Sequence, residues 1–460
     1  MTKIYENIII GDGPIGRVLH FNNLKSGKNS LILDAGEGLE LLRTAISVDS
    51  NINYVGQSMA PSLNPAASKF FWAGGCQGWP EEDINSEDKD TLPLGGLENA
   101  FYTSESRVAK LLGIKNFDFR KDLPSLSTTK YWFSKNSELT RIYAKVLSDP
   151  KLEKLKNFND RFHDKALTNV IITKIIPTED FIVLQGFNAI NMQQMEFHCM
   201  KLDLAAGTIE NTRLLLNSKS ELKIQNTDFL GKNLSDHLSL RFSTYSTSEL
   251  QKIIRMFSRP RTIDGTRIWP RLKKSINDST SPIRSFAHID QFKFDRTSLP
   301  LIYRILRRIG QERLYFGSSN SGKFDLNLFV EKLNEPSNEI VLTGRTTSGI
   351  SDIEIRFNLK EQELHGVEVI GKLFEDSLKI DFPTMRCESV KIEFSQIYAG
   401  THPSGTYRMS SAPSSGIVNS RCQLWGDYRI KVHGSGVFPR ASATHPTFPS
   451  IALSIIEDVT

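Results

Sequence analysis

The sequence predicts a mixed α/β (α+β) protein that contains a Rossmann-like nucleotide-binding domain. Three observations predict it. The chain opens with an apolar strand, a glycine-rich turn, a helix-like stretch and a second apolar strand closed by an acid. A second strand, turn and helix pattern follows at 202–216, and β segments at 170–176 and 181–184 precede it. Strands that alternate with helical patterns are typical of a parallel sheet covered by helices.

The opening turn, GDGPIG at 11–16, has the spacing and the flanking strands of a dinucleotide-binding fingerprint. Gly11 allows the tight turn, Gly13 lets the backbone approach a pyrophosphate, and Gly16 lets the helix pack closely on the strand. The helix N-terminus offers N–H donors and a positive dipole to the phosphates. Asp34 is placed to accept hydrogen bonds from the adenosine ribose, which favours FAD or NAD over NADP.

Composition excludes several protein classes. Of the 460 residues, 39% are apolar and 24% are charged, as in ordinary globular proteins. The four cysteines form no CxxC pair, so we expect neither a metal site nor a disulfide framework. No run approaches the roughly 20 apolar residues that span a bilayer. The first strand, at 4–10, leaves no room for a secretory leader, so we expect a cytoplasmic protein.

Charge is spread unevenly along the chain. The net charge is +5, but residues 251–313 hold 15 Lys and Arg against five Asp and Glu. This segment has the charge pattern either of a solvated surface or of a surface that meets an anionic partner. Within it, 299–316 alternates apolar and basic residues at helical spacing, which is typical of a surface helix and also of a helix that contacts an anionic membrane peripherally.

Two histidines near the C-terminus stand beside turn-forming residues. His402 lies in GTHPSGTYRM at 400–409, and His445 lies in ATHPT at 443–447. A periodic apolar stretch follows at 448–456, so His445 is expected where a helix begins. The positive end of that helix would face a ligand bound before it.

These C-terminal motifs are similar to the signature of glucose-methanol-choline (GMC) oxidoreductases, particularly the sugar and gluconate dehydrogenase branch. LAAGTIENTRLLLNS at 204–218, FLGKNLSDH at 229–237 and the NEIVLT strand at 338–343 also resemble family segments, in the family's order. The resemblance implies FAD and an FAD-binding domain built from three stretches, interleaved with a substrate domain that holds an antiparallel sheet. The implied boundaries are 1–95, 165–240 and 385–460 for the first domain, and 96–164 and 241–384 for the second.

By position, the resemblance also implies residue roles. His402 matches the family's active-site histidine, and His445 matches the second active-site residue, which is His or Asn in relatives. The alcohol proton would pass to a histidine base while hydride passes to flavin N5. His402 is the candidate base, and which histidine holds the proton stays open. The residues expected to contact FAD are Gly11, Gly13, Pro14, Ile15, Gly16, Asp34, Ala35, Gly74, Gly75, Cys76, Ala206, Gly207, Gly436, Val437, His445, Pro446 and Thr447.

The chain departs from the family pattern in two ways. Some relatives attach FAD through a histidine after the glycine turn, and 75–79 has none, so we expect FAD to be dissociable. A link through Cys76 has no matching motif. The chain is also shorter than typical members, which indicates a trimmed substrate domain. A trimmed domain would leave the pocket more open or completed by a partner. A phosphorylated or lipid-linked sugar is an alternative to a simple sugar or polyol, because a basic helix such as 299–316 can gate a pocket for such a substrate.

Two other functions stay open. A flavoprotein of this fold could catalyse a redox-neutral reaction, or it could be a non-catalytic binding protein. The histidine pair favours catalysis. Oxygen, a quinone or a protein could each reoxidise the flavin, and no nucleic-acid partner is expected.

Overall fold

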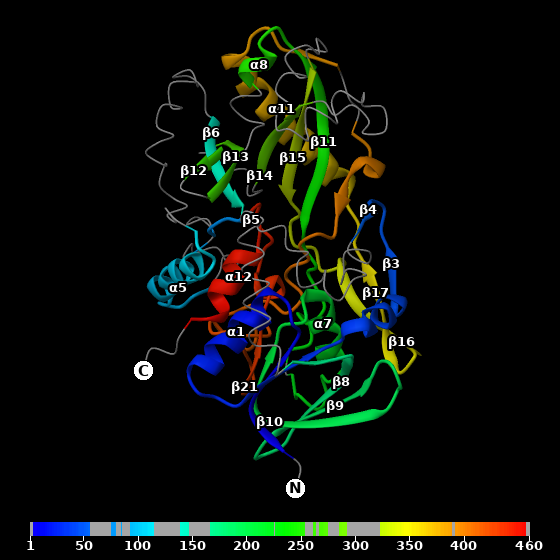
Figure 1. Cartoon of the computed structure of the whole chain (residues 1–460). Coiled ribbons are helices and arrows are strands. Elements are labelled where there is room, and N and C mark those ends of the chain that lie inside the picture. Colours follow the sequence, from blue (N-terminus) through cyan, green and yellow to red (C-terminus); the bar gives the residue numbers. More distant parts are fainter. Residues whose placement is uncertain are drawn as a thin grey trace, which may run out of the picture.

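The computed structural model shows an elongated molecule with a mostly parallel sheet at one end and an antiparallel sheet at the other (Figure 1). Every structural statement below concerns the described residues. These are 3–55, 75–79, 84, 93–114, 139–146, 166–224, 226–253, 261–263, 266–274, 285–291, 323–388 and 392–456.

The first sheet joins strands from three distant parts of the chain. β1 runs parallel to β2 on one side and to β10 on the other, and β10 runs parallel to β21. Ile8, Ile9 and Ile10 of β1 are all buried, as expected for a central strand covered on both faces. The strands, in sheet order and then off the path, are β20 (Gln423–Leu424), β21 (Asp427–Val432), β10 (Gln194–Leu204), β1 (Ile4–Ile10), β2 (Ser30–Asp34), β7 (Ala166–Thr168), β8 (Val170–Pro177) and β9 (Ile182–Asn188).

Helices cover this sheet. α1 (Pro14–Lys25) connects β1 to β2 and packs against α12 (Thr447–Ser454), and α12 in turn packs against α5 (Glu98–Leu111). α7 (Thr208–Asn217) follows β10 and packs against β8. The expected β segments are thus present in the described chain, and α1, α7 and α12 are the helices expected after 11–16, within 202–216 and after His445.

The second sheet is largely antiparallel and forms the upper half of Figure 1. Its apolar face packs on the long helix α11 (Glu361–Asp381), where Phe242 of β11 and Phe374 of α11 join one core. The strands are β4 (Asn53–Tyr54), β19 (Tyr398–Ala399), β11 (His237–Ser246), β15 (Lys323–Glu331), β14 (Ser285–Gln291), β13 (Thr266–Lys274), β6 (Leu139–Val146), β5 (Gly75–Cys76), β12 (Arg261–Ile263) and β18 (Arg386–Cys387).

A three-stranded sheet lies beside the first. β17 (Ile350–Arg356) pairs with β16 (Glu339–Thr347) and, in parallel, with β3 (Ile46–Asp49). The late strand expected at 338–343 is β16. The remaining short helices are η1 (Gly36–Gly38), α2 (Leu39–Thr44), α8 (Leu250–Ile253), η6 (Phe394–Gln396) and η7 (Ser435–Val437).

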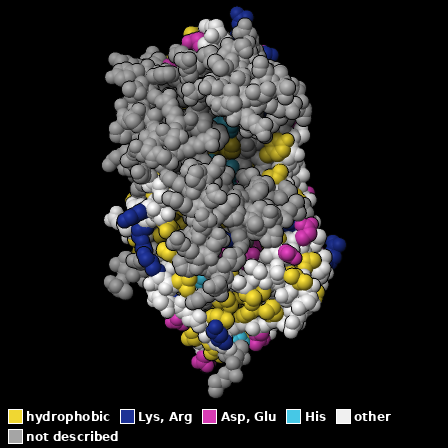
Figure 2. Space-filling model, viewed as in Figure 1, with side chains coloured by type: hydrophobic (Ala, Val, Ile, Leu, Met, Phe, Trp, Pro, Cys, Tyr) yellow, Lys and Arg dark blue, Asp and Glu magenta, His cyan; other side chains and the backbone are white. Residues whose placement is uncertain are grey.

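Most of the basic segment at 251–313, on which the membrane hypothesis depends, lies outside the described residues. The helix expected at 299–316 lies outside them as well. On the face shown in Figure 2, the described Lys and Arg side chains are scattered among acidic and hydrophobic ones. Within the described ranges, no helix has both the length and the apolar character needed to cross a bilayer.

A buried ion pair joins the end of β15 to the loop that precedes α12. Arg440 donates from Nε to Glu331 Oε1 at 2.8 Å and from Nη2 to Oε2 at 2.5 Å. The backbone N–H of Ser442 donates to the same Oε1 at 2.6 Å. The two side chains are 7% and 0% exposed, so this clamp is held in a region of low dielectric. It fixes the loop that carries His445.

We predict that Arg440→Met, which removes the cation facing Glu331, lowers the free energy of unfolding by about 3–5 kcal/mol, the usual cost of breaking a buried ion pair. Urea titration measures it. The control is Arg43→Met, which breaks the more exposed Arg43–Glu40 pair on α2 and should cost less than about 1 kcal/mol. Equal losses in the two variants would show that the buried clamp does not stabilise the fold.

Candidate active site

A cavity of about 750 Å³ runs from the carboxyl ends of β1 and β2 to the antiparallel sheet. Its wall joins the glycine turn after β1, the start of α7 and the loops that carry His402 and His445. Ligands of parallel α/β sheets bind at the carboxyl ends of the strands, which is where this cavity lies.

The turn after β1 is shaped for a ligand that approaches the backbone. Gly11 has φ +106°, and a Cβ on it would stand 2.5 Å from the Ala205 carbonyl oxygen. A Cβ on Gly16 would stand 1.9 Å from the carbonyl oxygen of Gly11, so α1 can pack this closely only on glycine. A Cβ on Gly13 would meet nothing within 4 Å, and no side chain caps α1. The first N–H groups of α1 are therefore accessible from the cavity side.

Two carboxylates shape this turn. Asp34 accepts from the backbone N–H of Asp12 and of Gly36, each at 2.9 Å, and so holds the turn against the end of β2. Asp12 would repel an anion, but Arg17 pairs with it at 2.8 Å. The turn is therefore locally neutralised, which suits phosphate binding.

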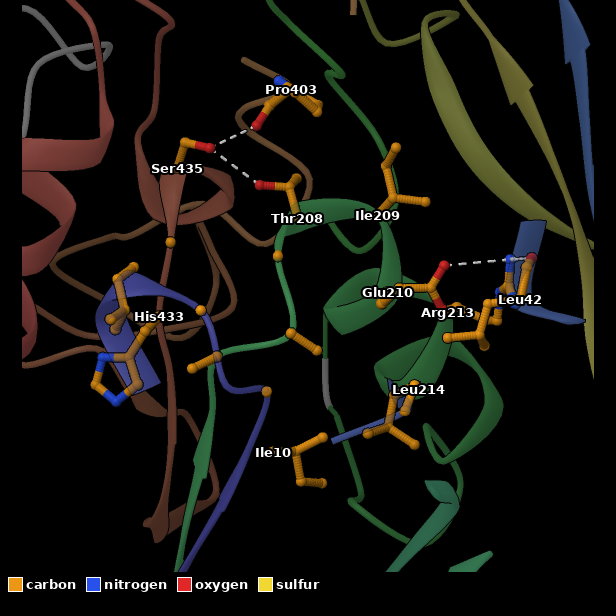
Figure 3. A pocket seen from close by; sticks show the side chains of 18 of the residues that line it. Ile10, Leu42, Thr208, Ile209, Glu210, Arg213, Leu214, Pro403, His433 and Ser435 are labelled. Carbon is orange, nitrogen blue, oxygen red and sulfur yellow. Dashed lines mark hydrogen bonds and ion pairs between the residues drawn. The ribbon is translucent and has the colours of Figure 1, made fainter. Parts of the chain in front are cut away.

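The start of α7 closes another side of the cavity (Figure 3). Ser435 Oγ lies 3.1 Å from Thr208 Oγ1 and donates to the Pro403 carbonyl at 2.7 Å, so it ties α7 to the His402 loop. Further along α7, Arg213 donates to the Leu42 carbonyl at 3.0 Å and lies 3.4 Å from Glu210. Among the described residues, no group accepts from Nε and Nη1 of Arg213.

At the other end of the cavity, three imidazoles form a cluster. The ring of His402 lies between the other two, with centroids 5.0 Å from His237 and 5.3 Å from His445. Nδ1 of His402 lies 3.2 Å from Nδ1 of His237. His402 and His445 line the cavity, and His237 lies behind His402. Within the described ranges, no group of His, Cys, Asp or Glu has an arrangement that could hold a metal ion.

A buried carboxylate sets the position of His402. Asp236, directly before β11, accepts from the backbone N–H groups of His237 (2.6 Å), Gly400 (3.0 Å) and His402 (3.1 Å). Ser239 of β11 pairs with Tyr398 of β19, and Ser235 bridges to Ser404, so the two segments run side by side. This pairing between β11 and β19 brings His237 and His402 together, although the two residues are far apart in sequence.

Burial keeps the imidazoles neutral. It lowers the pKa of His445 to about 3, with further lowering by the nearby charges of His237, Arg271 and His288. It lowers the pKa of His237 to about 4, and the pKa of His402 falls well below 6.5 through burial and then through its two histidine neighbours. At neutral pH all three rings are therefore neutral, and each has one nitrogen that carries no hydrogen. Burial raises the pKa of Asp236 to about 7, against the three N–H donors that favour its charged form.

Aromatic rings and a cation complete this end of the cavity. Gly75 faces the ring of His445, since a Cβ on it would lie 3.6 Å from Cδ2. Phe329 and Arg271 line the wall. Phe286 stacks on Phe329 with centroids 4.8 Å apart, and the Arg271 guanidinium lies 5.5 Å from the Phe286 ring.

Comparison with known proteins agrees with this architecture. Residues 335–454 match the family model described as GMC oxidoreductase. That stretch includes β16, β17, α11, α12 and the three histidines that line the cavity, His402, His433 and His445. No curated protein matches the sequence. Among solved structures, the crystal structure of pyridoxine 4-oxidase from Mesorbium loti is similar over 98% of each chain, with 14% identity and a TM-score of 0.55. The predicted mixed α/β fold is thereby confirmed.

Most residues that the GMC resemblance points to lie on the cavity wall. These are Gly11, Gly13, Pro14, Ile15, Asp34, Ala35, Gly75, Ala206, Gly207, His402, His445, Pro446 and Thr447.

Four others are described but are not part of the wall. Gly16 packs against the carbonyl of Gly11, and Gly436 packs against the Tyr407 ring, which a Cβ would approach to 2.2 Å. Cys76 and Val437 are 0% and 1% exposed within the core, so neither side chain reaches the cavity. Gly74 lies outside the described residues.

Sequence reasoning missed several residues of the GMC-like site. His237 ends the motif 229–237, but the motif alone does not indicate that its ring contacts His402. Arg271 lies on β13, and only the strand register brings it to the cavity. Glu210 and Arg213 belong to the motif 204–218. They are three residues apart on a helix, and this spacing indicates that they share one helix face.

The depressed pKa of His237 predicts a pH-dependent stability. Between pH 6.5 and about 4, the unfolded chain binds a proton at this position and the folded chain does not, so the unfolding free energy rises with pH. We expect His237→Asn to make that slope shallower by up to about 1.4 kcal/mol per pH unit. Urea titrations at several pH values measure it. The raised pKa of Asp236 makes the unfolding free energy fall with pH, and it does so in the wild type and in His237→Asn alike. Equal pH slopes in the two proteins would contradict a neutral, buried His237.

Proposed function

We propose that this protein is an FAD-dependent oxidoreductase that oxidises an alcohol group, with His402 as the proton acceptor. One observation carries the proposal. A single cavity has a dinucleotide-type glycine turn at one end and two neutral imidazoles at the other. The match of 335–454 to GMC oxidoreductases supports the same chemistry.

The described residues fit an FAD molecule. The turn at Gly11 and Gly13, with the N-terminus of α1, would hold the pyrophosphate, and Asp34 would bind the ribose. Arg213 offers buried N–H donors to the nucleotide end. Gly75, Pro446 and Thr447 would lie beside the flavin ring, which takes up a hydride from the alcohol carbon when bound. We propose non-covalent FAD, because Cys76 is buried in the core and 75–79 has no histidine.

The two histidines would act on the substrate hydroxyl. An alcohol gives up its hydroxyl proton as its carbon loses hydride, and a neutral imidazole can accept that proton at physiological pH. His402 would take the proton, and His445, whose ring lies 5.3 Å away, would hydrogen-bond the same oxygen. Partial burial lowers the pKa of both rings and so favours their neutral form before the reaction.

For the substrate we propose a sugar or polyol, or a phosphorylated or lipid-linked derivative. The guanidinium of Arg271 lies on the wall beside His445 and suits oxygen-rich or anionic groups. Phe329 offers an apolar face to the carbon skeleton. The similar solved structure is a pyridoxine 4-oxidase, whose name also describes an oxidation. Because that protein is only 14% identical to this chain, the substrate proposal is based on the cavity residues and not on this similarity.

We also propose the two-domain division given by the sequence. All strands of the first sheet come from 1–95, 165–240 and 385–460, whereas β6 and β12–β15 come from 96–164 and 241–384. Two contacts favour adjusted boundaries. α5 packs against α12, and β17 pairs with β3, so both belong on the nucleotide side.

We predict that His402→Ala leaves FAD bound and slows anaerobic flavin reduction by roughly a hundredfold or more, the usual effect of removing a general base. Stopped-flow absorbance with the best alcohol substrate measures the rate. His365→Ala is the matched control, because His365 is an exposed residue of α11 with 76% side-chain exposure. Unchanged reduction in His402→Ala would remove this residue from the mechanism.

A further inference from the structure

A line of ring nitrogens and a carbonyl runs behind His402. Nδ1 of His402 lies 3.2 Å from Nδ1 of His237, and Nε2 of His237 lies 3.3 Å from the Ala441 carbonyl oxygen. The inner ring is 1% exposed, so water does not replace these partners. Both ends of the line are fixed, because Asp236 anchors the two backbones and the Arg440–Glu331 clamp holds the loop of Ala441.

Hydrogen-bond chemistry assigns the protons along this line. A carbonyl oxygen only accepts, so Nε2 of His237 must carry a hydrogen. A neutral imidazole carries one hydrogen, so Nδ1 of His237 has a lone pair. Burial lowers the pKa of this ring to about 4, and the ring is therefore neutral at pH 7. The short contact between the two Nδ1 atoms then requires Nδ1–H on His402. Its own Nε2 is left with a lone pair.

We infer that His237 is a positioning residue that holds His402 in its Nδ1–H tautomer, so that Nε2 of His402 is the atom that accepts the substrate proton. This inference rests on the proposed alcohol oxidation for its functional meaning, but the tautomer itself does not depend on it. As Nε2 takes the hydroxyl proton, His402 becomes a cation with hydrogens on both nitrogens. His237 continues to accept from Nδ1–H and thereby stabilises that cation.

Thr401 offers the competing arrangement. Its Oγ1 lies 3.3 Å from Nδ1 of His402 and could donate to it, which would give the opposite tautomer. That arrangement would place two lone pairs against each other at the 3.2 Å contact with His237. The hydroxyl can instead accept from Nδ1–H beside His237, and this arrangement leaves no two lone pairs in contact between the two rings.

Nitrogen NMR of the full-length protein tests the tautomer. In protein labelled with ¹⁵N-histidine, long-range correlations separate protonated from bare ring nitrogens, and His402→Gln identifies the His402 signals by their loss. We expect Nδ1 of His402 to be protonated and Nε2 to be bare at pH 7. A protonated Nε2 with a bare Nδ1 would overturn the inference.

Two variants of His237 separate positioning from packing. His237→Asn can present its amide oxygen near the lost Nδ1 and should keep the His402 tautomer. His237→Leu removes the acceptor and should shift His402 toward Nε2–H, with flavin reduction slowed by roughly ten- to a hundredfold and substrate KM little changed. His20→Leu is the control, because it removes a buried histidine that bonds Ser30 far from this cluster. If His237→Asn and His237→Leu change the His402 tautomer and the rate of flavin reduction equally, His237 does not act by positioning His402.

The outcomes also distinguish this inference from the proposed function. If wild-type His402 is the Nδ1–H tautomer but no alcohol reduces the flavin, the inference stands and the proposed function fails. If an alcohol reduces the flavin while Nε2 carries the hydrogen, the function stands and the inference fails.

Discussion

The site depends on one buried carboxylate. Asp236 binds the backbone N–H groups of His237, Gly400 and His402, and so joins the first residue of β11 to the loop after β19. These bonds add to the Ser239–Tyr398 and Ser235–Ser404 pairing that holds the His402 loop against the antiparallel sheet. The same bonds set His402 against His237 and direct it to the cavity. A backbone interaction in the core therefore determines the geometry of the proposed proton acceptor.

Burial gives the cluster its chemistry. Three imidazoles and the Arg271 cation share a small region of low dielectric, so protonating any ring is costly there and the pKa values of the rings fall. The neutral form that a base needs is thus maintained across physiological pH. The opposite end of the cavity uses another device, in which Arg17 neutralises Asp12 so that an anionic ligand can approach the glycine turn. One cavity thereby has a glycine turn with a neutralised carboxylate at one end and neutral imidazoles at the other.

Local patterns were sufficient for part of this account. The turn at 11–16 and Asp34 follow from strand and glycine spacing, and His402 and His445 follow from motifs whose residues are adjacent in sequence. The other residues depend on long-range pairing. His237 meets His402 through the β11–β19 ladder, and Arg271 reaches the wall through the register of β13. Local sequence also does not show that the side chains of Val437 and Cys76 are buried in the core, because strand and turn packing set their direction.

The most direct test is an anaerobic absorbance scan of the purified protein, reconstituted with FAD and mixed with a panel of sugars, polyols and phosphorylated or lipid-linked sugars. We predict a yellow protein whose flavin band is bleached by one class of alcohol, because hydride transfer to the flavin removes that band. A protein that stays colourless and cannot take up FAD would show that the cavity is not an FAD site.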